Sequence, residues 1–251
     1  DFQIIKKLNS SVPITSNKKI LIPSDHQLLS MSNLEGEIIH RGAEAALILT
    51  QWNDYNSLVK YRFPKSYRVF KLDHQLRFQR TIKEAKALIN LSEAGLPVPL
   101  VYHIDPKLGL IYMQFIPWFT LKSKIPHLSK EELSLTFHNI GIKIAEIHQN
   151  DYIHGDLTTS NILWLSPYAF AFIDFGLCQR DINLEDKAMD LHLLKQVLIS
   201  THGSIFIPAY NSLIKGYENQ IGAEESLAIQ ERILKIEHRG RYIPKEERKI
   251  E

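Results

Sequence analysis

The stretch YIHGDLTTSNILW, residues 152–164, places His154, Asp156 and Asn161 close together in one short segment. A second stretch, AFIDFGLC at residues 171–178, adds Asp174 soon afterwards. The first stretch follows a long helical pattern and precedes two apolar runs typical of strands, so we expect Asp156 and Asn161 on a loop between helix and strand. Carboxylate and amide oxygens are ligands that Mg²⁺ prefers. The spacing therefore predicts a metal site near this loop.

Size and composition are those of an ordinary globular protein. The chain has 251 residues, of which 44% are hydrophobic and 23% are charged, and a chain of this length buries roughly 70–75% of its unfolded surface. The formal net charge of +2 is too small to indicate a nucleic-acid or membrane partner by itself. Cys178 is the only cysteine, so no disulfide can form within the chain, and a reducing compartment is expected.

The sequence contains no signal for a membrane. No run reaches the roughly 20 apolar residues of a membrane span, and the first residues, DFQIIKKLNSS, lack a signal-peptide core. We therefore expect a soluble, cytoplasmic protein with no membrane partner.

The first half of the chain has the pattern of a small sheet with one helix. Residues 1–34 form an N-terminal segment that the pattern leaves open, as a loop or a first strand. Residues 35–52 have the pattern strand, turn, strand, and β-forming residues surround Lys60 in a third strand. The other expected elements are a helix over residues 76–95 and strands over residues 98–105 and 109–116.

The second half is helical after a loop-like stretch around Pro117 and Pro126. Ser129 and Glu132 have the spacing of a capping box, which predicts that a long helix begins there. Further amphipathic helices are expected at residues 185–200, 208–218 and 223–240. The sequence therefore predicts an α+β bilobal fold, with a small β-rich N-lobe over residues 35–116, a helical C-lobe with a basic tail over residues 117–251, and a hinge near residues 114–118.

The segment IHGDLTTSN matches the kinase pattern H-R-D-x-x-x-x-N, with glycine in place of arginine, and Asp174-Phe175-Gly176 follows in the expected order. Order, spacing and flanking elements agree, which predicts a protein-kinase-like fold rather than a solvated charged loop. Phosphoryl transfer depends mainly on positioning and on neutralising charge. We therefore expect Asp156 as the catalytic base, Asn161 and Asp174 as Mg²⁺ ligands, and His154 as a residue that orders the loop.

A kinase-like site also needs a strand lysine paired with a helix glutamate. Lys60 in SLVKYR and Glu84 in RTIKEAKAL lie on the expected strand and helix. Lys71 is a competing lysine, but it lies later than the strand before the helix should allow. Glu93 is the nearby acidic alternative, and it lies at the expected end of the helix.

The nucleotide would contact two further segments. Small residues between the first two strands let backbone N–H groups approach phosphates, although no G-x-G-x-x-G pattern is present. The small residues are Gly42, Ala43 and Ala45, and Glu44 lies among them in the same expected nucleotide-binding segment. Met113 is expected to line an adenine pocket, with an ordinary core position as the alternative, and the backbone of the next residues would contact the base. Those residues are Gln114, Phe115 and Ile116.

The chain resembles the small atypical kinase subunit of the KEOPS (EKC) complex, the PRPK family, which is related to the RIO kinases. The matching segments include RGAEA, LVKYRFPKSYR, IHGDLTTSNIL, IDFGLCQ and EDKAMDLHLL, and the resemblance covers most of residues 35–241. It implies binding of ATP and Mg²⁺, serine/threonine kinase or ATPase activity, and a role in threonylcarbamoyladenosine modification of tRNA. It also implies the threonylcarbamoyl-transferase subunit and other KEOPS/EKC subunits as partners, contact with tRNA through the complex and, in a eukaryote, a nuclear location.

The chain departs from ordinary protein kinases after Gly176. Few residues separate Gly176 from Asp190, and no A-P-E motif appears, so we expect no phosphorylation-gated activation loop. Asp190 is predicted to anchor the catalytic loop through backbone N–H groups, with an exposed helix acid as the alternative. The reduced platform suggests that a partner completes or controls the site.

Two basic regions leave a direct RNA contact open. Residues 59–71 alternate basic with aromatic side chains, which suits RNA but also a half-buried strand, and the tail at residues 237–251 adds further charges. Two other functions remain as alternatives to the KEOPS subunit. One is a free-standing protein or small-molecule kinase, and the other is a scaffold that binds nucleotide without turnover.

Overall fold

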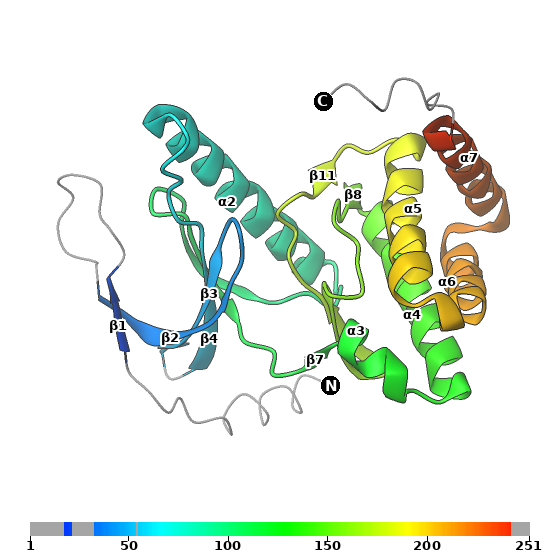
Figure 1. Cartoon of the computed structure of the whole chain (residues 1–251), viewed down its shortest axis with the longest axis horizontal. Helices are drawn as coiled ribbons and strands as arrows, with labels where there is room; N and C mark the ends of the chain where they lie inside the picture. Colours follow the sequence, from blue (N-terminus) through cyan, green and yellow to red (C-terminus); the bar gives the residue numbers. More distant parts are fainter. Residues whose placement is uncertain (1–17, 22–32, 54, 242–251) are drawn as a thin grey trace. The chain divides into compact units, whose positions relative to one another are not determined.

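The computed structural model describes residues 18–21, 33–53 and 55–241, and the chain divides into two compact units (Figure 1). The first unit spans residues 1–93 and 98–118, and the second spans residues 94–97 and 119–251. These limits lie near the predicted lobe limits but differ from them, because residues 94–97 belong to the second unit. Of residues 1–34, which the sequence pattern left open between loop and strand, residues 18–21 and 33–34 lie in strands, and the others lie outside the described residues.

The first unit contains an antiparallel sheet of six strands within the described residues, in the order β1-β2-β3-β4-β6-β5. One cluster of its core consists of Ile48, Val59, Tyr61 and Leu110. Because side chains alternate along a strand, Val59 and Tyr61 face this core while Lys60 points to the other face. The strands are β1 (Lys18–Leu21), β2 (Asn33–Arg41), β3 (Ala46–Trp52), β4 (Tyr55–Tyr61), β5 (Val101–Asp105) and β6 (Leu110–Gln114).

Helix α2 (Phe70–Glu93) packs against β5 and β6 in the same unit. Its buried face changes character along its length: Asp73 and Arg77 near its start are buried and charged, whereas Leu88 and Leu91 near its end are apolar. The predicted start at residue 76 was therefore wrong by about two turns. Apolar periodicity marks only the second part of the helix, and ion pairs fix the first part.

The second unit holds two small sheets and a set of helices within the described residues. Strands β10 (Ala169–Phe172), β9 (Ile162–Ser166) and β7 (Phe119–Thr120) form one sheet, and β8 (Tyr152–Ile153) pairs with β11 (Gln179–Arg180). The capping box of Ser129 and Glu132 is confirmed at the start of α4. The helices are α3 (Leu121–Lys124), the 3₁₀ turn η1 (Ile125–His127), α4 (Lys130–Gln149), α5 (Leu184–Thr201), the 3₁₀ turn η2 (Gly203–Ile205), α6 (Phe206–Ile221) and α7 (Ala223–Arg241).

The expectation of a loop around Pro117 and Pro126 was partly wrong. The stretch contains β7, α3 and η1, and Pro126 lies in the first positions of η1, where its missing N–H has no partner to lose. Elements this short show no periodicity, so the composition alone suggested a loop.

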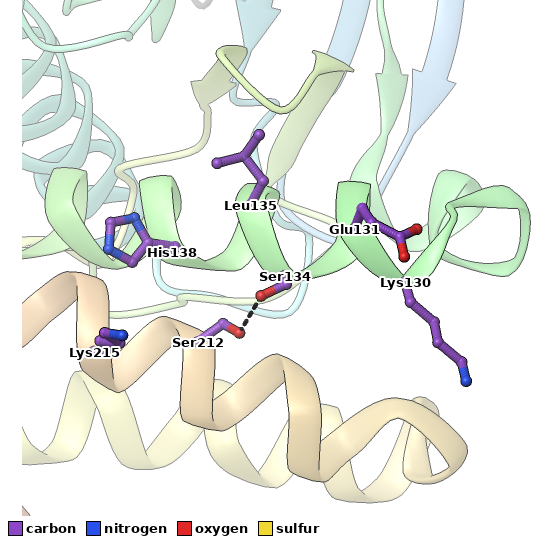
Figure 2. A pocket seen from close by; sticks show the side chains of 7 residues that line it. All are labelled: Lys130, Glu131, Ser134, Leu135, His138, Ser212 and Lys215. Atoms are coloured by element: carbon purple, nitrogen blue, oxygen red, sulfur yellow. Dashed lines mark hydrogen bonds between the residues drawn. The ribbon is translucent and has the colours of Figure 1, made fainter.

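Helices α4 and α6 cross at unusually short range. A Cβ atom added to Gly141 would lie 2.0 Å from the carbonyl oxygen of Leu213, and one added to Gly216 would lie 1.9 Å from that of His138. Any side chain at either glycine would force the two helices apart. Figure 2 shows a groove along this crossing, where Ser134 and Ser212 point toward each other with their hydroxyl oxygens 2.9 Å apart.

Helix α7 is fixed to α5 by ion pairs at its surface and by Ile229 and Ile233 in the core. Lys187 on α5 lies 2.7 Å from Glu225, and Lys195 lies 2.8 Å from Glu237. Of the helices in the described ranges, none is long and apolar enough to cross a membrane.

Candidate active site

In the first unit, Lys60 and Glu84 meet in a buried ion pair. Lys60 on β4 has its Nζ atom 2.8 Å from Oε1 of Glu84 on α2, and the two residues are 7% and 1% exposed. Arg62 donates to the other carboxylate oxygen of Glu84 and is also buried. The structure thus joins the predicted strand lysine and helix glutamate, and it adds a second cation that the sequence did not suggest.

The two competing residues lie elsewhere. Lys71 is exposed in the first turn of α2, so it is not a strand residue. Glu93 is exposed at the last position of the same helix. Their positions leave Lys60 and Glu84 as the lysine and glutamate that face each other from strand and helix.

The loop of Gly42, Ala43, Glu44 and Ala45 joins β2 to β3. The Gly42 N–H donates to the Ala45 carbonyl at 2.9 Å, which closes the loop as a tight turn. Lys65 donates to the carbonyl of Ala43. The side chain of Glu44 is half exposed and pairs with Arg80 and, at 3.4 Å, with Arg68.

Glu44 brings a negative charge to a loop expected to meet phosphates, and the neighbouring arginines compensate for it. Partial burial raises the pKa of the Glu44 carboxyl, but the hydrogen bonds and charges of Arg80 and Arg68 outweigh burial and hold that pKa below its ordinary value. Glu44 therefore stays ionised and matched by arginine. Its charge is balanced within the first unit.

The segment after β6 shows how the expected adenine contacts lie. Met113 is 6% exposed in β6, between Leu58 and Val101 on the neighbouring strands, which is a core position. The Gln114 N–H donates to the Leu100 carbonyl at 2.7 Å. Phe115 and Ile116 follow, both partly buried. An adenine contact for these residues stays a prediction.

In the second unit, Asp156 and Asn161 lie in one loop between β8 and β9. The Asn161 side-chain amide donates to Oδ2 of Asp156 at 2.9 Å and to the Asp156 carbonyl at 2.8 Å. The Ile173 N–H in turn donates to the Asn161 carbonyl at 2.9 Å, which ties the segment before Asp174 to the same loop. The loop therefore presents a carboxylate whose direction an amide fixes.

The backbone of Asp174 lies in a conformation that most residue types avoid. Its φ of 65° lies in the left-handed region, where few residues other than glycine, asparagine and aspartate are found. Its carboxylate accepts from the Gly176 N–H at 3.2 Å, and the residue is exposed. Strained backbone of this kind is often found at functional sites.

Asp190 of α5, which is 3% exposed, anchors the loop that contains Asp156 and Asn161. Its carboxylate accepts from the N–H groups of His154 at 2.8 Å and Gly155 at 2.9 Å. His148 contributes Nε2 at 3.3 Å, and its Nδ1 lies 2.8 Å from the hydroxyl of Tyr217. The prediction that Asp190 anchors the loop is confirmed, and the alternative of an exposed helix acid was wrong.

His154 orders the loop, as its residue type and spacing predicted. It is 1% exposed, and its Nε2 lies 3.0 Å from the Ile173 carbonyl, so Nε2 is the protonated nitrogen. Nδ1 can then accept the Asp156 N–H at 3.3 Å. Cys178 is fully buried, as expected for a small packed side chain.

We predict that the contribution of Asp190 to the free energy of unfolding is lost at low pH. Burial raises the pKa of the Asp190 carboxyl, but His148 and His154 outweigh burial and hold that pKa below its ordinary value. A carboxyl with a lowered pKa in the folded state stabilises the protein above the unfolded pKa of about 3.9, and this contribution disappears as pH falls through the folded pKa.

The asparagine of the Asp190→Asn variant cannot titrate. The free energy of unfolding of this variant should therefore be about 1–3 kcal/mol lower than that of the wild type at pH 7. This gap between the two free energies should narrow below about pH 4. Urea unfolding at several pH values measures the gap. The exposed Asp151→Asn serves as the control, with a small gap at every pH. A gap for Asp190→Asn that stays constant between pH 7 and pH 3 would show that the carboxylate charge is not what anchors the loop.

Comparisons with known proteins agree with this architecture. A RIO domain matches residues 48–186. The KEOPS complex subunit Bud32 of Pyrococcus abyssi is 38% identical over 212 residues, which cover 82% of this chain and 96% of that protein. A probable bifunctional tRNA threonylcarbamoyladenosine biosynthesis protein of Methanobrevibacter smithii is 36% identical over 83% of this chain. This chain spans only 37% of that longer relative.

Among solved structures, the Rio2 kinase–ADP/Mg²⁺–phosphoaspartate complex from Chaetomium thermophilum is similar, with a TM-score of 0.50 and 17% identity over 81% of this chain and 71% of that one. The fold is that of an atypical, RIO-type kinase, which confirms the predicted fold class. The chain belongs to the RIO-domain family and, within it, to the relatives of the KEOPS subunit Bud32. The resemblance stated from the sequence motifs is thereby confirmed.

Proposed function

We propose that this protein is an ATP- and Mg²⁺-dependent atypical serine/threonine kinase or ATPase, and that it works as a subunit of a KEOPS complex in threonylcarbamoyladenosine modification of tRNA. The observation that supports the activity best is the Asp156 carboxylate, fixed by the Asn161 amide at 2.9 Å. The Asp190 carboxylate accepts hydrogen bonds from two backbone N–H groups of the same loop. A carboxylate fixed in this way can accept a proton from a hydroxyl group without first changing its orientation.

The reaction is the transfer of the γ-phosphoryl group of ATP. Asp156 takes the proton of the attacking hydroxyl, from a serine, a threonine or water, as that oxygen bonds to the γ-phosphorus. The bond from the γ-phosphorus to the bridging oxygen breaks, and ADP leaves with the electron pair. Lys60, oriented by Glu84 at 2.8 Å, would hold the phosphates.

The donor set suits Mg²⁺ bound together with a nucleotide. Within the described ranges, no three His, Cys, Asp or Glu side chains form a group that could hold a metal ion. Asn161 and Asp174 offer one amide and one carboxylate, and Mg²⁺ is commonly bound by one or two such groups plus substrate phosphates and waters. When bound, Mg²⁺ would neutralise charge on the phosphate oxygens.

The segment between Gly176 and α5 supports the role of a partner. It is short, and its strand β11 pairs with β8, so it offers little surface on which a substrate peptide could dock. The relatives are named for the KEOPS complex or for threonylcarbamoyladenosine biosynthesis. We therefore place this protein next to the threonylcarbamoyl-transferase subunit, with tRNA reached through the complex.

The test is Mg²⁺-dependent phosphate release from ATP, measured for the protein alone and with the threonylcarbamoyl-transferase subunit and tRNA. Stimulation by both additions, by about tenfold or more, is expected if they complete the site. Turnover indifferent to both would indicate a free-standing kinase instead. Nucleotide binding with no turnover under any condition would indicate a scaffold.

A further inference from the structure

The loop that carries Asp156 and Asn161 turns two of its side chains inward. Leu157 and Thr159 are both 0% exposed, whereas the residues on either side of each are at least partly exposed. Leu157 needs only apolar surroundings, but a buried hydroxyl group is costly unless it has a hydrogen-bond partner. The conformation of the loop at Thr159 therefore depends on what its hydroxyl group meets inside the second unit.

His202 supplies that partner. Its Nε2 atom lies 3.0 Å from the hydroxyl oxygen of Thr159, and His202 is 8% exposed. Burial, together with the charge of Lys122, lowers the pKa of His202 below its ordinary value, so the ring is neutral at pH 7. A neutral imidazole can bond a hydroxyl group in either tautomer, because each ring nitrogen is a donor or an acceptor. The contact is thus a hydrogen bond between two buried side chains that lie 43 residues apart in the sequence.

The main chain of His202 ends α5 without help from the side chain. The His202 N–H donates to the Leu198 carbonyl at 3.0 Å, and the His202 carbonyl accepts from the Ile205 N–H at 3.0 Å. Both bonds belong to the backbone, and any residue other than proline can make them. The imidazole is therefore not needed to terminate the helix, and its contact with Thr159 calls for a separate explanation.

Thr159 lies inside the segment on which the site depends. The Asn161 amide closes this segment by donating to the Asp156 carbonyl at 2.8 Å and to its carboxylate at 2.9 Å. Asp190 accepts from two N–H groups that precede Asp156. Beyond Asp156, the Lys122 N–H donates to the Thr159 carbonyl at 2.9 Å. Asp190 thus holds the first part of the loop, and the contacts of Thr159 hold the second part.

We propose that His202 is a positioning residue for phosphoryl transfer, because it fixes the loop of Asp156 and Asn161 through the hydroxyl group of Thr159. This inference rests on the proposed function, in which Asp156 accepts a proton and Asn161 holds Mg²⁺. A displacement of about 1 Å in a catalytic group can lower a rate by about a hundredfold, so a support at this point affects turnover. The competing explanation is that His202 only stabilises the fold.

The two explanations differ in what they predict for molecules that remain folded. A histidine that only stabilises the fold predicts that its loss lowers the free energy of unfolding and leaves the turnover of the folded molecules unchanged. A positioning histidine predicts a local effect, in which the loop opens more often and kcat falls while KM for ATP changes little.

The experiment measures hydrogen exchange of residues 154–161 and steady-state phosphate release from ATP for variants of the full chain. Thr159→Val keeps the volume of the side chain and removes its hydroxyl group. Exchange of the loop should therefore rise by about three- to tenfold, and kcat should fall by about tenfold or more. KM for ATP should change by less than about threefold.

His202→Leu should have the same effects as Thr159→Val. The double variant that combines the two substitutions should be no worse than either single variant, because both substitutions remove the same hydrogen bond. Thr159→Ser keeps the hydroxyl group, so its kcat should stay within about threefold of that of the wild type.

Thr136→Val is the matched control for stability. Thr136 on α4 is also 0% exposed, and its hydroxyl group accepts from the Trp164 indole N–H of β9 at 3.1 Å, outside the loop. Its substitution removes a buried hydrogen bond of the same kind, so the free energy of unfolding should fall to a similar degree. Exchange of residues 154–161 and kcat should both stay within about twofold of the wild type.

Two results would overturn the proposal. One is a kcat for Thr159→Val equal to that of Thr136→Val, and the other is loop exchange in Thr159→Val as slow as in the wild type. If His202→Leu does not fold, the contrast between Thr159→Val and Thr159→Ser decides. The proposed function fails in a different way, when the wild type releases no phosphate even with its partners, and hydrogen exchange alone then decides whether His202 holds the loop.

Discussion

Asp156→Asn should lower Mg²⁺-dependent phosphate release from ATP by about a hundredfold or more, with the affinity for ATP changed by less than about threefold. The amide cannot accept the proton of the attacking hydroxyl. Its carbonyl oxygen can still accept the hydrogen bond that Asn161 donates to Oδ2 at 2.9 Å, so the loop should keep its shape. Steady-state turnover together with a separate titration of ATP binding measures both quantities.

Asp151→Asn provides the matched control for that substitution. Asp151 is exposed, lies just before β8, and has a φ of 61°, a conformation that asparagine also adopts readily. Its turnover should equal that of the wild type. If Asp156→Asn also kept full turnover, Asp156 would not be the base, and the proton would have to leave by another route.

Asp174→Ala should remove most of the Mg²⁺-dependent turnover, by about a thousandfold, because the variant loses a carboxylate for the metal that neutralises charge on the phosphates. Raising the Mg²⁺ concentration should recover little of it. The measurement is phosphate release as a function of Mg²⁺ concentration. Turnover within about tenfold of the wild type at saturating Mg²⁺ would be incompatible with Asp174 as a metal ligand.

Alanine at position 174 also introduces backbone strain. The control variant must therefore carry alanine at a position with a similar positive φ. The φ of Asp174 is 65°, and that of Asp181 is 57°, so alanine is disfavoured by about 1–2 kcal/mol at either position. Asp181 is exposed and has no proposed role in catalysis. Asp181→Ala should therefore lower stability to a similar degree and leave turnover unchanged, which separates the effect of strain from the loss of a ligand.

The parts of the fold that the sequence predicted well are those fixed by local chemistry. Ser129 and Glu132 cap α4 because both partners of the capping box lie within one turn of each other. The helices after residue 184 have regular apolar stripes, and the Asn161 side chain hydrogen-bonds Asp156, only five residues earlier. Interactions this short in sequence can be inferred from spacing.

The parts that the sequence missed depend on partners far along the chain. Residues 59–71 were a candidate for a half-buried strand, but the strand ends at Tyr61, a loop follows, and α2 begins at Phe70. The polar start of α2 is buried because Arg77 pairs with Asp73 at 2.8 Å and Asp73 also lies 3.6 Å from Arg68. A contact of residues 59–71 with RNA stays a prediction.

Arg62 and Tyr217 illustrate the same limit within the candidate site. Arg62 meets Glu84 on another element, and its position two residues after Lys60 was the one available hint that both face α2. Tyr217 on α6 reaches His148 on α4, 69 residues earlier, and nothing in either segment indicates this contact. Residues of this kind, which position others from distant elements, can be identified only in the folded structure.

The pairing of β11 with β8 has a consequence for how a cell would control this protein. In many kinases the segment after the Asp-Phe-Gly motif alternates between two paths, and a phosphate group on it selects one of them. Here Gln179 and Arg180 are paired with Ile153 and Tyr152, so the path of this segment is set by the fold itself. A phosphate group on this segment would then have no second path to select, so we expect no switch of that kind between Gly176 and α5.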